Sequence, residues 1–174
     1  MTRRLILNIV LLGTVLMLFN SCSYKLSLNG SSIPQGMKTI DIGFFENNAP
    51  LVVPTLSQTF TEALKNRIRT QTSLSITRGE ADGSMTGSIT GYSIVPVSVQ
   101  AGAGNVAPIA GLSRLTITVN VKYVYDADKK LSFEESFTKS KDFTGDISSQ
   151  EQALIPDIVR QLTDDIFNRA FANW

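Results

Sequence analysis

Residues 114–123 alternate strictly between polar and apolar side chains, and this is the clearest periodic pattern in the chain. A period of two is typical of a β-strand with one face against a core and the other in solvent. The positions expected to face the core are Leu115, Ile117, Val119, Val121, Tyr123 and Tyr125. A strand of this kind needs neighbouring strands and a covering layer. The pattern therefore predicts a sheet that is covered on one face.

Five further segments carry strand patterns. They lie at residues 23–28, 37–45, 74–76, 84–97 and 131–143. In the second segment Ile40, Ile42 and Phe44 are expected to share one face. The parity of the apolar residues changes within the fourth segment, which predicts a bulge or bend near Gly91. The last segment follows a turn at 126–130 and is expected to form a hairpin with residues 114–125.

Two segments change to a helical period. From Pro54 to about residue 70 the apolar residues recur every four positions, with Pro54 near the first turn, where its missing N–H costs little. A second helix is predicted after residue 148, because Ser148 and Glu151 have the spacing of a capping box. Pro156 predicts a kink or a weak first turn there. The apolar stripe of this helix is Leu154, Ile158, Leu162 and Ile166.

The order of these elements predicts one α+β domain over residues 22–174. We expect a two-layer sandwich in which a mostly antiparallel or mixed sheet carries two helices packed on one face. The other face of the sheet is expected to be rich in Thr, Ser and Asn and open to solvent or to a partner. The uncharged stretch 98–113 is expected to be the longest loop.

The composition excludes many enzyme classes. The chain has no histidine, and Cys22 is its single cysteine. Nucleophile systems that need histidine, His-ligated zinc, internal disulfides and CxxC metal sites are therefore excluded. The adjacent carboxylates at 134–135 and 164–165 point in different directions on a strand or a helix, so neither pair is suited to acid–base work. We expect no catalytic site, no metal and no cofactor.

The first 22 residues have the pattern of a bacterial lipoprotein leader, with Arg3, Arg4, an apolar run at 5–19, and Cys22 at its end. The run is shorter than the roughly 20 residues that a transmembrane helix needs. It predicts a signal peptide at residues 1–21 and a covalent diacylglycerol and acyl anchor, such as palmitate, at Cys22. The alternative is a secretory peptide followed by an unmodified thiol. Without the leader, 14 basic residues face 15 acidic ones, so no global charge favours nucleic acid.

Several stretches, in the same order along the chain, resemble the LptE family and more closely its Bacteroidetes branch. They are CSYKL (22–26), MKTIDIGFFENN (37–48), LSQTFTEALK (56–65), RLTITV (114–119) and DIFNR (165–169). The resemblance implies a non-enzymatic lipoprotein on the periplasmic side of the outer membrane and within the lumen of the β-barrel LptD. It would help that barrel to assemble and to deliver lipopolysaccharide to the outer leaflet. The alternative is an adaptor or pilotin for another secretion or assembly complex.

Two surfaces are candidate binding sites. The first is a set of cations expected at one edge of the last hairpin, where they would engage the phosphates of lipopolysaccharide: Arg114, Lys122, Lys129, Lys130, Lys139 and Lys141. The alternative is an ordinary solvated edge. The second is a barrel-contact or acyl-chain-contact loop within 98–113, with a plain connector as its alternative. Its apolar residues are Val106, Pro108, Ile109 and Leu112.

Two smaller expectations concern the C-terminal helix. Asp165 and Arg169 have the i, i+4 spacing of an exposed ion pair. Trp174 is expected to anchor either this helix or an interface.

Overall fold

The structure is a computed structural model that describes residue 3 and residues 33–172 apart from 35, 52 and 101–108. Its elements are β1 (Thr39–Ile42), β2 (Glu46–Asn47), α2 (Leu56–Gln71), β3 (Ser75–Thr77), β4 (Gly83–Gln100), β5 (Ile109–Tyr125), the 3₁₀ turn η1 (Lys129–Leu131), β6 (Phe133–Phe143), the 3₁₀ turn η2 (Ile147–Ser149) and α3 (Glu151–Phe171). The predicted signal peptide, the Cys22 anchor, the strand at 23–28 and Trp174 lie outside the described residues.

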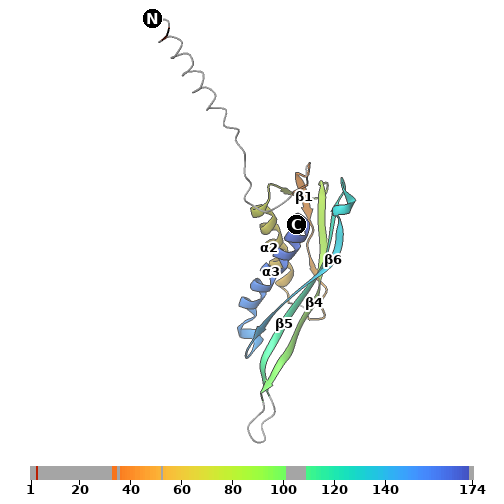
Figure 1. Ribbon diagram of the computed structural model, residues 1–174. Helices are drawn as coiled ribbons and strands as arrows, with labels where there is room; N and C mark the ends of the chain where they lie inside the picture. The colour runs from red at the N-terminus through yellow and green to blue at the C-terminus, as the bar shows by residue number, and fades with distance from the viewer. Residues whose placement is uncertain (1–2, 4–32, 35, 52, 101–108, 173–174) are drawn as a thin grey trace.

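The six strands form one mixed sheet. Its order is β3-β1-β4-β5-β6, and β2 also pairs with β4. β1 is parallel to both β3 and β4, whereas β4, β5 and β6 are antiparallel neighbours. Both helices lie over the same face of this sheet (Figure 1). The predicted α+β two-layer fold is therefore confirmed.

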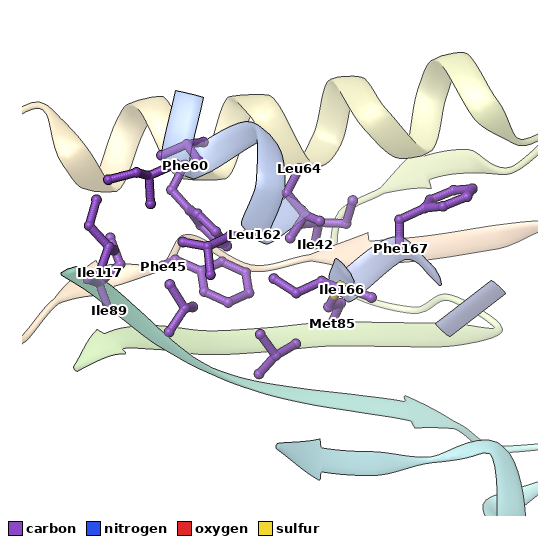
Figure 2. Close-up of a cluster of buried hydrophobic side chains, with 14 of the residues drawn as sticks. Ile42, Phe45, Phe60, Leu64, Met85, Ile89, Ile117, Leu162, Ile166 and Phe167 are labelled. Atoms are coloured by element: carbon purple, nitrogen blue, oxygen red, sulfur yellow. The ribbon is translucent and has the colours of Figure 1, made fainter. Parts of the chain in front are cut away.

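The core lies between the sheet and the two helices, as Figure 2 shows. The predicted stripes of both helices are buried, and so are the six core positions predicted for β5. Phe45 and Phe60 meet edge to face, with their ring centroids 5.0 Å apart. Burying a side chain of this size contributes about 1.5–3 kcal/mol. The core is thus the part of the fold for which the periodic patterns are most informative.

The predicted bulge in β4 is confirmed. Ile89 pairs with Val119 and Gly91 with Thr118, so the extra residue between them shifts the register. Because of this shift, Met85, Ile89 and Tyr92 are all buried although their spacing breaks a period of two. Tyr92 is thereby placed beneath the start of α3.

The prediction for Phe44 is wrong, because the chain between β1 and β2 contains an extra residue. Ile42 lies opposite Met85 and Glu46 opposite Ser88, so four steps along this chain match three along β4. The extra residue reverses the facing of the side chains. Phe44 is consequently 60% exposed, and Phe45 takes the core position with 0% exposed.

The bounds predicted for the longest loop, 98–113, are also wrong. β4 continues to Gln100 and β5 begins at Ile109, so both ends of that stretch belong to the hairpin ladder. The backbone pairing of this ribbon does not need charged side chains, and its Val and Ile residues favour strands. Leu131, expected in the last strand, instead ends η1.

The predicted capping box of the C-terminal helix does not form. α3 begins at Glu151, and its N-cap Gln150 makes no side-chain cap hydrogen bond. Ser148 lies in η2, where its backbone N–H donates to Asp146. Glu151 instead accepts a 2.6 Å hydrogen bond from the Tyr92 hydroxyl, because the bulge in β4 brings that ring under the helix. Burial and then this hydrogen bond raise the pKa of Tyr92. The helix continues without interruption through Pro156.

Candidate functional site

The six predicted cations do not gather on one edge of the hairpin. Lys139 and Lys141 lie opposite the buried residues Ile117 and Leu115, so they are on the helix-covered face of the sheet. Arg114 and Lys122 are on the open face. The expected gathering is wrong because neighbouring positions of paired strands alternate between the two faces.

Four of these cations have carboxylate partners. Arg114 Nε lies 2.6 Å from Asp142 Oδ1, and Lys122 Nζ lies 3.8 Å from Glu134. Under the helices, Lys139 Nζ lies 2.7 Å from Asp165, and Lys141 contacts Asp157. The Arg114 guanidinium lowers the pKa of Asp142, and the Lys141 ammonium lowers the pKa of Asp157. An anionic ligand would have to compete with these carboxylates.

Lys129 and Lys130 are different, because both are exposed in η1. Within the described residues neither ammonium group has a hydrogen-bond or ion-pair partner. They are therefore the two predicted cations that stay available for a ligand.

The predicted Asp165–Arg169 pair does not form. Arg169 Nε donates to Glu135 at 3.0 Å, and its guanidinium lies 4.5 Å from the centroid of the Phe133 ring. Asp165 is bound by Lys139 instead. These contacts form because α3 lies across β6, so charged side chains of α3 pair with charged side chains of β6. The adjacent carboxylates at 134–135 and at 164–165 pair with separate cations, as expected because neighbouring side chains point in different directions.

The far end of the β4–β5 hairpin contains the candidate barrel-contact residues. Ile109 pairs with Gln100, and Leu112 pairs with Ser98. Val106 and Pro108 lie outside the described residues. The hairpin extends beyond the helices (Figure 1). Val95 and Val97 of the same ribbon are 48% and 45% exposed, and the sequence reasoning did not single them out.

The open face of the sheet is lined by hydroxyl and amide side chains, as predicted. The Thr118 and Thr138 hydroxyls lie 3.0 Å apart across β5 and β6. No helix lies over this face in Figure 1. Its uncharged polar residues include Thr86 and Ser88 of β4, Thr116, Thr118 and Asn120 of β5, and Ser136, Thr138 and Ser140 of β6. This face offers many hydrogen-bonding groups and little net charge.

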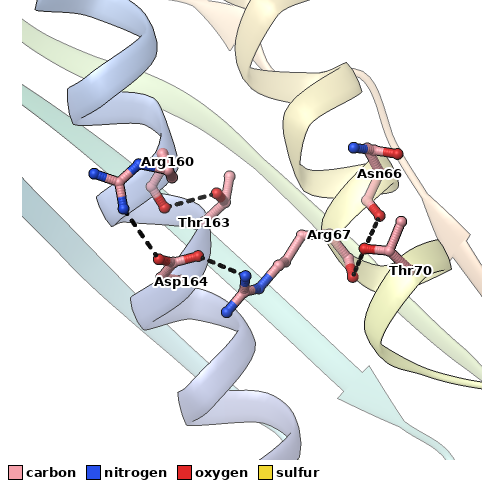
Figure 3. A network of polar contacts seen from close by, with 6 residues as sticks. All are labelled: Asn66, Arg67, Thr70, Arg160, Thr163 and Asp164. Atoms are coloured by element: carbon pink, nitrogen blue, oxygen red, sulfur yellow. Dashed lines mark hydrogen bonds and ion pairs between the residues drawn. The ribbon is translucent and has the colours of Figure 1, made fainter. Parts of the chain in front are cut away.

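An ion cluster lines the pocket between α2 and α3, and Figure 3 shows its residues. Asp164 of α3 lies 3.2 Å from Arg67 of α2 and 3.9 Å from Arg160 of its own helix. The Arg67 contact is an ion pair without hydrogen-bond geometry, since Asp164 Oδ1 and Arg67 Nε have no hydrogen-bond partner. Arg67 also lies 5.3 Å from the centroid of the Phe167 ring. This cluster connects the two helices.

A second group of cations was not predicted from the sequence. Lys65 and Arg69 of α2 meet Arg78, which follows β3, around one pocket. The positions of Lys65 and Arg69, four residues apart, indicate a shared helix face. The local sequence pattern does not indicate that the end of β3 lies beside this face of α2.

Most of the chain matches one known protein family. The chain matches LptE, described as lipopolysaccharide assembly, over residues 37–170. The chain belongs to the LptE family. No curated protein matches it. The match includes every candidate cation and begins after the predicted anchor Cys22.

Solved structures of low sequence identity share the LptE-like fold of this chain. The rare lipoprotein B of Shewanella oneidensis has 14% identity and a TM-score of 0.54, covering 75% of this chain and 92% of that chain. The lipoprotein B of Nitrosomonas europaea has 15% identity and a TM-score of 0.51, covering 84% and 88%. A protein of Xanthomonas campestris has 12% identity and a TM-score of 0.54, covering 79% and 87%. At these identities the likeness shows the fold alone.

Within the described part of this LptE-family chain, no helix is both long and apolar enough to cross a membrane. The same residues contain no group of three or more side chains suited to hold a metal ion.

Proposed function

We propose that this protein is a non-enzymatic outer-membrane lipoprotein that associates with an LptD-like β-barrel. It helps that barrel to assemble and to insert lipopolysaccharide into the outer leaflet. The observation that carries the proposal is the LptE match over residues 37–170. The expected acyl anchor at Cys22 would hold the protein on the periplasmic side of the membrane, with the folded domain reaching into the barrel lumen.

The surface of the domain is compatible with a position inside a barrel lumen. The interior of a large membrane barrel is polar, so a protein within it needs polar groups on its surface. The open sheet face provides hydroxyl and amide groups, and most charges on β6 are paired. Neutral polar groups lose less hydration free energy on contact than unpaired charges do. Both features therefore support contact with a polar barrel wall.

Contact with lipopolysaccharide is part of the proposal. Lys129 and Lys130 are the strongest of the six candidate cations, because no carboxylate among the described residues pairs with their ammonium groups. The exposed Val95 and Val97 add apolar surface at the hairpin end, which suits acyl chains. The other four candidates would have to leave exposed ion pairs, each of which is worth only about 0–1 kcal/mol.

Conditional depletion of the protein in the cells that make it tests this function. We expect a lower amount of folded LptD-like barrel in the outer membrane and less lipopolysaccharide at the cell surface. Both should return when the wild-type chain is supplied from a second gene copy. Loss of a different secretion barrel, with normal levels of LptD-like barrel and surface lipopolysaccharide, would favour the adaptor or pilotin alternative.

A further inference from the structure

A basic pocket lies between the second half of α2 and the end of the edge strand β3. Its volume is about 310 Å³, and the residues that line it include Ile42, Glu62, Lys65, Arg69, Thr77 and Arg78. β3 is the outermost strand on this side of the sheet, paired only with β1 among the described strands. The pocket therefore lies at an edge of the domain, where a soluble ligand can reach it.

The fold brings these side chains together from two segments. Glu62, Lys65 and Arg69 are three and four residues apart, so they share one face of α2. β3 runs parallel to β1, which requires the chain to cross over through α2 and return beside it. This return places Arg78, directly after β3, at the same pocket.

The charges of the pocket are poorly compensated. Lys65 Nζ lies 3.3 Å from Glu62 Oε1. Arg69 and Arg78 have no hydrogen-bond or ion-pair partner within the described residues. Three cations thus face one carboxylate. The C-terminal end of α2 adds a partial charge of only about −0.5, so the pocket stays positive.

Thr77 also lines the pocket, but its side chain belongs to the other face of the sheet. It pairs with Asp41, one position along from Ile40 and Ile76, which face the core, so its side chain lies on the face away from α2. The Thr77 hydroxyl is therefore not a donor to a ligand in this pocket. The neighbouring Asp41 does not line the pocket and accepts from the backbone N–H of Gly79.

We propose that this pocket binds a phosphate group, either free or as a phosphate ester. The planar guanidinium groups of Arg69 and Arg78 would each give two N–H donors to phosphate oxygens. Lys65 would contribute a point charge. The site is separate from Lys129 and Lys130 and does not depend on the barrel partnership proposed above.

Isothermal titration calorimetry of the acylated protein in a neutral detergent tests the site. The probes are inorganic phosphate and glucose 1-phosphate, with acetate as the carboxylate control. We expect saturable binding of phosphate, weakened about tenfold or more in the double variant Arg69→Gln/Arg78→Gln, because two charged hydrogen-bond donors are lost. The matched control is Lys38→Gln/Arg160→Gln, which removes the same charge from two exposed side chains outside the pocket and should leave phosphate affinity unchanged.

Two single variants add opposite expectations. Glu62→Gln should strengthen phosphate binding, because Glu62 is the carboxylate that lines the pocket. Lys65→Gln should weaken binding, because it removes a cation that lines the pocket. A normal circular dichroism melt for each variant separates lost binding from lost folding.

The outcomes decide the proposal. Tighter binding of glucose 1-phosphate would identify a phosphorylated headgroup as the ligand, and tighter binding of inorganic phosphate would identify the free ion. Absence of saturable phosphate binding to the wild-type protein would overturn the proposal. Equal loss of affinity in the two double variants would overturn it as well, because it would indicate attraction by net charge alone.

Discussion

Gly87 occupies the place where β4, β5 and the Phe45 ring approach one another most closely. A Cβ atom at this position would lie 2.0 Å from the backbone oxygen of Asn120 and 2.6 Å from Cε1 of Phe45. The Asn120 oxygen belongs to the β5 backbone, which is held by strands on both sides. The contact therefore leaves no room for any residue except glycine.

Replacing Gly87 by alanine should destabilise the domain by about 1–3 kcal/mol or more, because an added methyl group would push β5 and Phe45 away. Urea unfolding followed by circular dichroism measures the change. Ser88→Ala is the matched control, since Ser88 is the next residue of β4 and faces the open side. It should change stability by less than about 0.5 kcal/mol. Equal stability of the two variants would show that β5 can move at little cost.

The partners of the surface charges could not be predicted from neighbouring sequence. Arg114 is 28 residues from Asp142, and Arg169 is 34 residues from Glu135. Helix spacing alone favours an Asp165–Arg169 pair, but β6 lies under α3 and supplies Lys139 and Glu135. The proximity of Arg69 and Arg78, whose guanidinium groups have no partner within the described residues, is unpredictable for the same reason, since it depends on the sheet topology.

The strands and helices themselves were largely predictable. β5 has a strict period of two, and the change of parity in β4 correctly predicts the bulge at Gly91. The extra residue between β1 and β2 was not predictable, because Phe44 and Phe45 are both apolar and either could fill the core. The length of the β4–β5 hairpin is not predictable from residues 98–113, because a lack of charge and many small residues are also typical of a loop.

The hairpin end should be the least protected part of β4. β6 ends at Phe143, opposite Ser113, so the described ribbon beyond this point consists of two strands only. Val97 lies in this two-stranded part and is 45% exposed, whereas Met85 and Ile89 are fully buried. We expect backbone amides in residues 94–98 to exchange with deuterium at least about tenfold faster than those in residues 84–89.

Hydrogen exchange with mass spectrometry on the purified protein in neutral detergent measures this difference. Both segments belong to one strand, so each serves as the control for the other in digestion and labelling. Equal protection of the two segments would contradict the expectation. It would mean that another part of the chain, or a second molecule, covers the hairpin end in solution.

At the scale of the whole molecule, the α+β class follows from the order of the elements, but the mixed topology does not. β1 lies between β3 and β4 and is parallel to both, an arrangement that no local pattern encodes. For the function, too, the sequence indicates the family but not the contact surface. The five stretches at 22–26, 37–48, 56–65, 114–119 and 165–169 together indicate the LptE family, whereas the surface that meets a partner depends on which faces the completed fold leaves open.

The most direct test of the proposed function is an affinity pull-down of the tagged, acylated protein from gently solubilised outer membranes, followed by mass identification. We predict that a large LptD-like β-barrel is recovered with it in near-equal molar amount. A tagged lipoprotein of unrelated family from the same membrane is the control for non-specific recovery. Recovery of another secretion component in place of that barrel would contradict the account.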